Sequence, residues 1–265
     1  MDNMVVGTVD ILTWCGLTTA ARRNAIMEDL MPGPEGLQNL SDETEEALKD
    51  VCDGYNKRRN QPLIISRAAV KKLTALMYWV QDRTRLEEDP NFSDGTTRAE
   101  FLEQIKEAAE RARLRQEQKK VGENLIGAEF TVQLKSRHQW ERWLLELKTT
   151  LGAIIGAKGV PLTYVIREND APDLLGHQTW EAKAIAATTL RGREYVRDAT
   201  TVHQIIIRNI TEDSDAYTYV KPILKHENGR KDFKALINRY ESQAGIQERI
   251  SEAQKVLSQI RYRNE

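Results

Sequence analysis

Apolar residues recur at helical spacing along most of this chain, and most clearly between residues 137 and 156. The large apolar side chains of this stretch are Trp140, Trp143, Leu144, Leu147, Leu151, Ile154 and Ile155. Their offsets of 0, 3, 4, 7, 11, 14 and 15 residues place them on one face of an α-helix. This face carries no nucleophile, metal ligand or phosphate-binding loop, so we interpret it as a packing or assembly element.

The first part of the chain, residues 8–56, predicts four or five short helices. Thr18 or Thr19 is expected to cap one of them and Ser41 another, because a side-chain oxygen can accept a hydrogen bond from a free first-turn amide. The Pro- and Gly-rich segment Met31–Gly36 interrupts the apolar pattern between these helices. Two longer helices should follow. Ser66 is expected to begin one, and the capping-box pair Thr97 and Glu100 opens the other.

Residues 130–265 predict a string of helices with a single strand candidate, Val160–Ile166. Trp180 heads one apolar helix, and Pro222 is expected to kink or end another. The last predicted helix carries apolar residues at alternating spacings of four and three, which is the pattern of a coiled-coil seam over about two heptads. We call this set the C-terminal seam: Ile246, Ile250, Ala253, Leu257 and Ile260.

Because one strand does not make a sheet, these patterns predict an all-α, multi-helical fold. Three regions are expected: a small acidic helical domain at 1–57, a connecting helical region at 62–125 and a larger helical domain at 130–265. A basic linker separates the first two regions. The first 56 residues hold eleven acidic side chains against three basic ones, so this end is distinctly acidic.

Composition narrows the function classes. The 265 residues are 30% charged and 40% hydrophobic, with a net charge of −1 that does not favour nucleic acid or an anionic membrane as a bulk partner. Cys15 and Cys52 lie on apolar helical faces without a CxxC motif, which predicts buried thiols and neither a disulfide framework nor a zinc site. The sequence shows no membrane-spanning stretch and no signal peptide, so a cytoplasmic protein is expected.

Candidate chemistry is sparse. The four histidines are far apart, and no motif for a serine hydrolase, zinc protease, dinucleotide or phosphate loop is present. A basic run could contact RNA phosphates, although a solvated helix end explains it as well: Arg111, Arg113, Arg115, Lys119 and Lys120. The tryptophans of the 137–156 stretch could stack on bases, but their period with Leu147 and Leu151 favours core burial. We expect no enzyme activity, cofactor or small-molecule substrate.

The chain resembles two known families. The segment Gly36–Glu43, amid short helices, loosely resembles a sterile alpha motif (SAM) domain. Residues 140–265 resemble the capsid region of Gag proteins from Copia-type LTR retrotransposons, closest to those of diatoms and related algae. The matching blocks, in order, are Trp140-Glu-Arg-Trp143, Pro161–Glu168, Trp180–Ala186, Gly192-x-x-Tyr195, Val202–Ile205, Asn228–Asp232, Ala235–Tyr240 and Ile260–Glu265, with upstream likeness at Leu76–Asp82 and Ala108–Leu114.

The resemblance to Gag implies a structural protein that self-assembles to package element RNA. Gag chains of this family usually continue into a second capsid lobe and a CCHC zinc knuckle, whereas this sequence stops at Glu265 with neither. A fragment, or a degenerate or co-opted copy, with weak RNA binding is therefore expected. The expected core or assembly residues are Trp140, Trp143, Leu147, Trp180, Ile246, Ile250 and Leu257. The alternative is a non-enzymatic helical module that binds partner proteins without forming particles.

Overall fold

The fold is all-α, as the sequence predicts. The computed structural model describes residues 6–58, 60, 62–173, 176–242, 250, 251, 254, 255 and 257. Helices dominate this described part, and it contains no β-strand beyond two isolated bridges. The chain divides into two compact units, unit 1 at residues 1–117 and unit 2 at residues 118–265. The border falls within a single helix, α5, which spans Arg98–Leu125.

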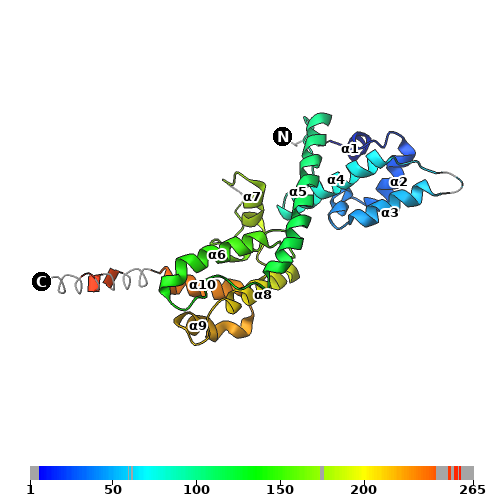
Figure 1. Ribbon diagram of the computed structural model, residues 1–265. Helices are drawn as coiled ribbons and strands as arrows, with labels where there is room; N and C mark the ends of the chain where they lie inside the picture. Colours follow the sequence, from blue (N-terminus) through cyan, green and yellow to red (C-terminus); the bar gives the residue numbers. More distant parts are fainter. Residues whose placement is uncertain are drawn as a thin grey trace. The chain divides into compact units, whose positions relative to one another are not determined.

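Unit 1 is built from short helices around one long helix, α4 (Figure 1). Its elements before α5 are α1 (Thr8–Trp14), α2 (Ala20–Leu30), the 3₁₀ helix η1 (Gly36–Ser41), α3 (Glu45–Asn56) and α4 (Arg67–Arg85). Local capping explains several of the starts. Thr19 caps α2, Ser66 caps α4, and the Thr97–Glu100 capping box opens α5, as predicted. Ser41 instead ends η1, and the cap of α3 is Thr44, whose side chain accepts from the amide of Ala47.

A single hydrophobic core runs through unit 1. Leu12 of α1, Leu48 of α3, Leu73 of α4 and Phe101 of α5 are all buried in the same cluster. The regions 1–57 and 62–125, which the sequence separates at its basic linker, therefore join in one unit up to residue 117. The physical reason is that the short N-terminal helices bury their apolar faces against α4 and α5, so they do not form a core of their own.

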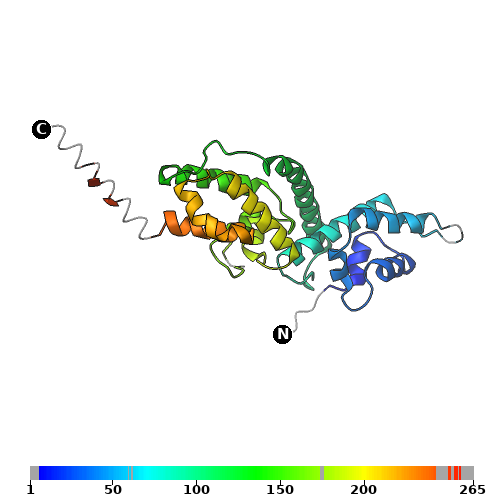
Figure 2. The ribbon, with the colours of Figure 1, turned by 90° about the horizontal axis from the view of Figure 1, so that it is seen from below.

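Unit 2 packs shorter helices around α6 and α8 (Figure 2). Its elements after α5 are η2 (Arg137–Gln139), α6 (Trp140–Ala153), η3 (Leu162–Ile166), α7 (Trp180–Ala187), α8 (Arg193–Arg208), α9 (Asp215–Val220), η4 (Lys221–His226) and α10 (Gly229–Tyr240). Pro222 sits where the α-helix α9 gives way to η4, as its missing amide donor predicts. Helices α8 and α10 lie side by side.

Two predictions for unit 2 are wrong in detail. The expected strand at Val160–Ile166 is the 3₁₀ helix η3, with only one bridge, between Ile155 and Pro161. The helix expected up to Gly156 ends at Ala153, because Ile154 is already extended at φ −99° and ψ 119°. Both differences have one cause. A tight turn after α6 folds the apolar run back onto the core, and Val160, Tyr164 and Val165 are each fully buried there.

That turn depends on a buried carboxylate. Asp198 of α8 is 3% exposed and accepts hydrogen bonds from the amides of Ala157 (2.6 Å) and Lys158 (3.2 Å) and from the hydroxyl of Tyr164 (2.9 Å). A Cβ atom at Gly156 would lie 2.5 Å from Asp198 Oδ2, so only glycine fits beside this carboxylate. At Gly229, the first residue of α10, a Cβ atom would lie 2.5 Å from the backbone nitrogen of His203, and glycine there lets α10 approach α8 closely.

Candidate functional site

The predicted aromatic face lies in the core of unit 2. Trp140 is 3% exposed and Trp143 is fully buried, as is Leu147 one turn later. The two indoles stack at 5.6 Å, and Trp140 also stacks on Tyr240 of α10 at 4.9 Å. Its indole Nε1 donates to the Glu241 carboxylate at 3.0 Å. The core alternative for these residues is therefore confirmed, and no free stacking surface remains on this face for nucleic-acid bases.

The C-terminal seam is exposed where the structure describes it. Ile250 and Leu257 lie on helical backbone and leave 45% and 62% of their surface open to solvent. Ile246, Ala253 and Ile260 lie outside the described residues. Trp180, the remaining predicted core or assembly residue, is half-buried at the first position of α7.

The basic run of α5 separates into two groups. Arg111 and Arg115 both turn toward Asp82 of α4, whose carboxylate they contact at 2.9 and 2.6 Å. Arg85 contacts the same carboxylate at 3.1 Å, and the Asp82 side chain is only 3% exposed. Three guanidinium groups thus surround one buried carboxylate, and the contacts from Arg111 and Arg115 tie α5 to α4. Arg111 and Arg115, which the sequence offers as RNA contacts, are consequently structural cations.

The other members of the run face solvent. Arg113 keeps 81% of its side chain exposed and pairs with Glu117 one turn later at 3.1 Å. Lys119 and Lys120 are exposed as well. Among the five candidate RNA contacts, these three are the ones whose charges are open to a ligand.

Long-range hydrogen bonds hold the Pro161–Glu168 block in place. Arg230 of α10 is 7% exposed and donates at 2.7 Å to the carbonyl of Val165 and at 2.7 Å to that of Arg167. Arg167 in turn donates to the carbonyls of Ile185 (2.8 Å) and Thr188 (2.5 Å) around the end of α7. Arg167 and Arg230 therefore organise the fold of this part of unit 2.

One histidine takes part in a buried polar pair. His203 Nδ1 of α8 lies 2.6 Å from Oδ2 of Asp232, a fully buried residue of α10. Burial raises the pKa of Asp232, and the hydrogen bond from His203 partly opposes that shift. The pair closes the α8–α10 interface beside Gly229, so we interpret it as structural. Within the part of the chain that the structure describes, no group of three His, Cys, Asp or Glu residues is arranged to hold a metal ion.

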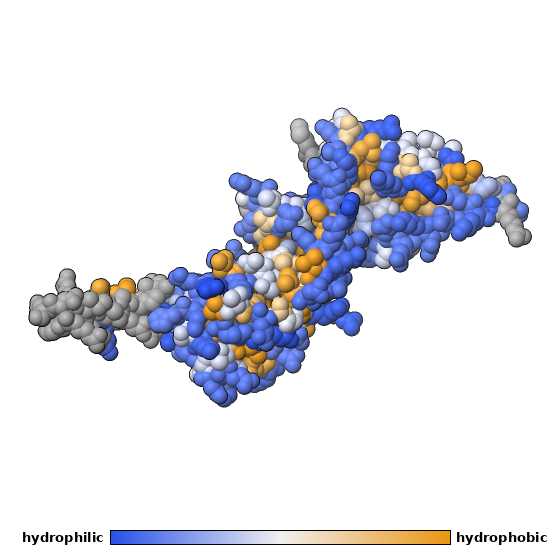
Figure 3. Space-filling model, in the orientation of Figure 1, coloured by the Kyte–Doolittle hydropathy of each residue, from blue (hydrophilic) through white to orange (hydrophobic). Residues whose placement is uncertain are grey.

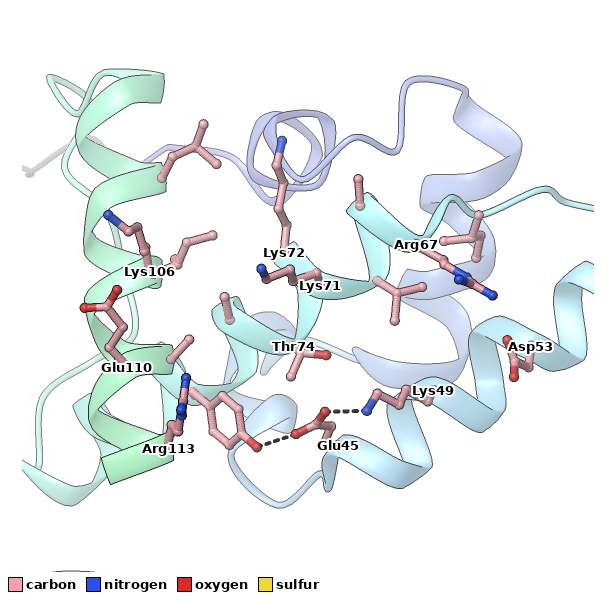
Figure 4. A pocket seen from close by; sticks show the side chains of 18 of the residues that line it. Glu45, Lys49, Asp53, Arg67, Lys71, Lys72, Thr74, Lys106, Glu110 and Arg113 are labelled. Carbon is pink, nitrogen blue, oxygen red and sulfur yellow. Dashed lines mark hydrogen bonds and ion pairs between the residues drawn. The ribbon is translucent and has the colours of Figure 1, made fainter. Parts of the chain in front are cut away.

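The surface of unit 1 carries a groove that the sequence patterns do not predict. It lies in unit 1 between α3, α4 and α5 and encloses about 1110 Å³ (Figure 4). Figure 3 shows hydrophobic surface beside α5 in this unit, bordered by hydrophilic residues. The apolar lining includes Val70 and Ala75 of α4 and Leu102, Ile105 and Ala109 of α5. We call this feature the basic groove, because its charged lining is predominantly positive.

Six cations and three carboxylates line the basic groove. The cations are Lys49, Arg67, Lys71, Lys72, Lys106 and Arg113. One of the carboxylates, Glu45, is already engaged by Lys49 and by the hydroxyl of Tyr78, the latter at 2.8 Å. These hydrogen bonds lower the pKa of Glu45, and burial raises the pKa of Tyr78 to about 12. At neutral pH the groove therefore holds a charged Glu45 and a neutral Tyr78.

A buried hydroxyl also faces this groove. Thr74 of α4 is 8% exposed and lines the groove, and its Oγ1 has no hydrogen-bond partner among the residues that the structure describes. The sequence carries a weak signal for such a site, since the polar Thr74 interrupts the apolar face of α4 and Lys71 comes one turn before it. That signal could not locate the groove, because the walls come from three helices whose packing no local pattern specifies.

Comparisons with known proteins leave the family open: no protein-family model, curated protein or solved structure matches this chain. Among the helices in the described residues, none is both long and apolar enough to cross a membrane.

Proposed function

We propose that this chain is a structural protein that self-associates, with the role of a Gag-like capsid subunit. The observation that carries the proposal is the exposed C-terminal seam. Ile250 and Leu257 are seven residues apart on helical backbone, which places them on the same helix face, and both are open to solvent. Two heptads are too short for a stable isolated helix, so the seam gains stability by packing against an apolar surface.

The architecture of unit 2 supports this role. A repeating shell needs compact subunits that keep their shape while weak contacts form between them. Unit 2 meets this requirement through the fully buried Trp143, the Asp198 turn and the Arg230 hydrogen bonds. Seven of the eight sequence blocks between residues 140 and 265 that resemble Gag proteins fall on or beside α6, η3, α7, α8 and α10 of this unit, and the eighth, Ile260–Glu265, lies outside the described residues.

Assembly of this kind depends on many weak contacts acting together. We therefore expect a monomer or dimer in dilute solution and larger particles or sheets at high protein and salt concentration. Sedimentation velocity and negative-stain microscopy over a concentration series test this expectation. Ile250→Asp should abolish the larger species, because a carboxylate in the seam would have to be desolvated in the contact.

Val196→Asp on α8 is the matched control, since Val196 is also exposed (60%) and lies outside the seam. It should assemble like the unmodified protein. A chain that stays monomeric at all concentrations, or one whose assembly is equally sensitive to both substitutions, would overturn the proposal. Circular dichroism of Ile250→Asp verifies that the helical content of the described units is kept.

The proposed cargo is RNA, bound weakly and without sequence preference. With a net charge of −1 and with Arg111 and Arg115 engaged by Asp82, binding should rest on the exposed cations of the run, chiefly Lys119 and Lys120. Fluorescence anisotropy with a labelled oligonucleotide over a salt series tests this. Lys119→Gln with Lys120→Gln should reduce the salt slope by about 1.4, at ~0.7 for each lost phosphate contact with a single strand. Tight, sequence-selective binding would contradict the proposal.

A second function is favoured by the basic groove: a module that binds partner proteins without forming particles. The same sedimentation series separates the two functions. The module predicts a monomer at every concentration together with saturable binding of a partner, whereas the capsid subunit predicts large assemblies with or without a partner.

A further inference from the structure

We propose that the basic groove of unit 1 binds an acidic amphipathic helix from another protein. The proposal is independent of the capsid function, because it rests on unit 1 and not on the C-terminal seam. It follows from four properties of the groove: its size, its apolar floor, its charged rim and one unpartnered hydroxyl.

The size and openness of the groove favour a peptide segment. Pockets for small molecules usually enclose ~300–1,000 Å³ and bury most of the ligand. The basic groove exceeds this range at about 1110 Å³ and lies open along α4 and α5 (Figure 4). Its walls are three helices, and a groove of this kind accommodates the apolar face of a further helix.

The floor supplies the apolar contact. Val70, Leu102 and Ala109 are only half-buried in the protein alone, although Ile105 and Ala75 beside them are buried. A helix with apolar residues at positions i, i+3, i+4 and i+7 would cover these side chains and remove their remaining surface from water.

The rim determines the charge of the bound helix. Six cations face three carboxylates in the lining. Lys49 pairs with Glu45 inside the groove, while Lys106 and Arg113 pair at 3.7 and 3.1 Å with Glu103 and Glu117, which lie outside the lining. The side chains labelled in Figure 4 show Lys71 and Lys72 on α4 across from Lys106 on α5, so positive charge borders the floor on both sides. A helix whose polar flanks carry glutamate or aspartate would match both borders, whereas a basic helix would be repelled.

The Thr74 hydroxyl adds a specific contact. A buried polar atom without a partner destabilises the free protein, and a ligand that supplies the partner recovers that free energy on binding. An oxygen-bearing side chain on the apolar face of the bound helix, such as asparagine or glutamine, would accept this hydrogen bond. The bound helix is thus expected to carry one polar residue within its apolar stripe.

Nucleic acid fits this groove less well than an acidic helix. Single-stranded RNA is held by stacking on aromatic rings beside positive charge. Tyr78 is the one aromatic residue among those that line the basic groove, and its hydroxyl is tied to Glu45. The rest of the floor is aliphatic and offers no stacking platform.

The test uses the full chain with Ile250→Asp, which keeps it free of seam-mediated assembly. The probe is a synthetic labelled peptide with leucine at i, i+3, i+4 and i+7, one asparagine within that stripe and glutamate at the flanking positions. Fluorescence anisotropy should show saturable binding, and a peptide with lysine in place of glutamate should not bind. Amide chemical shift changes in an NMR titration should cluster on α4 and the part of α5 that lines the groove.

Two substitutions test the mechanism. Lys71→Glu, at an exposed rim position, should weaken binding at least about tenfold, because like charges would face each other across the contact. Arg98→Glu is the matched control: Arg98 is exposed at the first position of α5 and does not line the groove, so binding should stay unchanged. Thr74→Val should weaken binding without lowering the melting temperature, since it removes only the unpartnered hydroxyl.

The proposal is overturned by any of several outcomes. These are no binding of the acidic peptide at millimolar concentration, equal binding of the lysine peptide, equal loss in Lys71→Glu and Arg98→Glu, or shift changes outside the groove. Displacement of the peptide by a short oligouridine of equal affinity would make the groove a nucleic-acid site instead. Self-association of the Ile250→Asp chain that Lys71→Glu abolishes would identify a second copy as the occupant.

Discussion

The indole Nε1 of Trp143 donates a 2.9 Å hydrogen bond to the backbone carbonyl of Asn209, and both residues are fully buried. The Asn209 side chain extends this contact, since its Oδ1 accepts from the amide of Phe130 at 2.7 Å and its Nδ2 donates to the carbonyl of Ile205 at 2.8 Å. The start of unit 2, α6 and the end of α8 therefore meet at one polar position within an apolar core.

Removal of the Trp143 indole should strongly destabilise the protein. Trp143→Ala is expected to lower the free energy of unfolding by ~3–5 kcal/mol, the range for emptying a large aromatic site, and Trp140→Ala by a similar amount. Denaturant unfolding followed by far-ultraviolet circular dichroism measures the change. Leu145→Ala on the same helix is the control, because Leu145 is 68% exposed and should change stability by no more than ~0.5 kcal/mol. Equal effects at both positions would mean that the assigned face of α6 is wrong.

Removal of the charge on Asp82 should destabilise unit 1. Asp82→Asn leaves the Arg111 and Arg115 guanidinium groups without their carboxylate. Breaking such a buried pair should lower the free energy of unfolding by about 3 kcal/mol. This is the lower end of the usual range, because both arginines keep some contact with water. Glu117→Gln is the comparison, since its pair with Arg113 is exposed and should contribute ~0.5 kcal/mol or less. Thermal and chemical denaturation of the three proteins provide the values. If Asp82→Asn leaves the stability unchanged, Arg111 and Arg115 do not have a structural role.

Two glycine-to-alanine substitutions should change the stability of the protein in opposite directions. Gly229→Ala would place a Cβ 2.5 Å from the His203 backbone nitrogen, so α10 must shift away from α8 at a cost of ~1–3 kcal/mol. Gly54→Ala within α3 meets no atom within 4 Å and should stabilise the protein by ~0.5–1 kcal/mol through helix propensity. Melting temperatures of both variants decide the matter. A tolerated Gly229→Ala would mean that the two helices do not approach so closely.

Both thiols should be unreactive in the folded protein. Cys15 and Cys52 are fully buried and free, as the sequence predicts, and burial raises their pKa values to about 12 and about 11. The thiolate is the reactive form, so Ellman's reagent at pH 8 should label neither cysteine in native protein and both in guanidinium chloride. Rapid native labelling of one thiol would place that residue at the surface.

Acid should weaken the contact that Asp170 makes with α10. Hydrogen bonds from Lys234 and Arg230 lower the pKa of Asp170 to about 2. Since this folded-state pKa is depressed, the stabilisation is complete above the unfolded pKa near ~3.9 and is lost as the pH falls toward about 2. The melting-temperature difference between the unmodified protein and Asp170→Asn should shrink over that interval. Because Asp170 is exposed, high salt should also reduce this melting-temperature difference at pH 7. A difference that does not change with pH would contradict the stabilising role of the Asp170 carboxylate.

Local patterns in the sequence predict the helices well, but they predict contacts between residues far apart in the sequence poorly. The buried face of α6 follows from its period alone, and Thr19, Ser66 and Thr97 act on amides within the next turn. The 160–166 run, by contrast, has the composition of a strand. Its 3₁₀ form is held by Arg230, whose contacts are more than sixty residues away in sequence.

For the candidate sites, too, the sequence shows local features but not the contacts that depend on packing. The basic run of α5 is visible in the sequence, but the partner that neutralises Arg111 and Arg115 lies 29 and 33 residues earlier. The basic groove exists only once α3, α4 and α5 are packed together, so its lining is scattered over about seventy residues. Charge and period indicate which faces are polar, and packing decides which polar faces meet.

The Asp198 turn restricts how this sequence can diverge. Because the carboxylate occupies the space beside Gly156, a side chain at position 156 requires a compensating change at Asp198, 42 residues away. Homologues whose overall identity has fallen below detection should still pair a small residue at the first position with an acid at the second, followed by the close-approach glycine of α10. Such a spaced trio could trace the ancestry of this fold through sequences that otherwise share little.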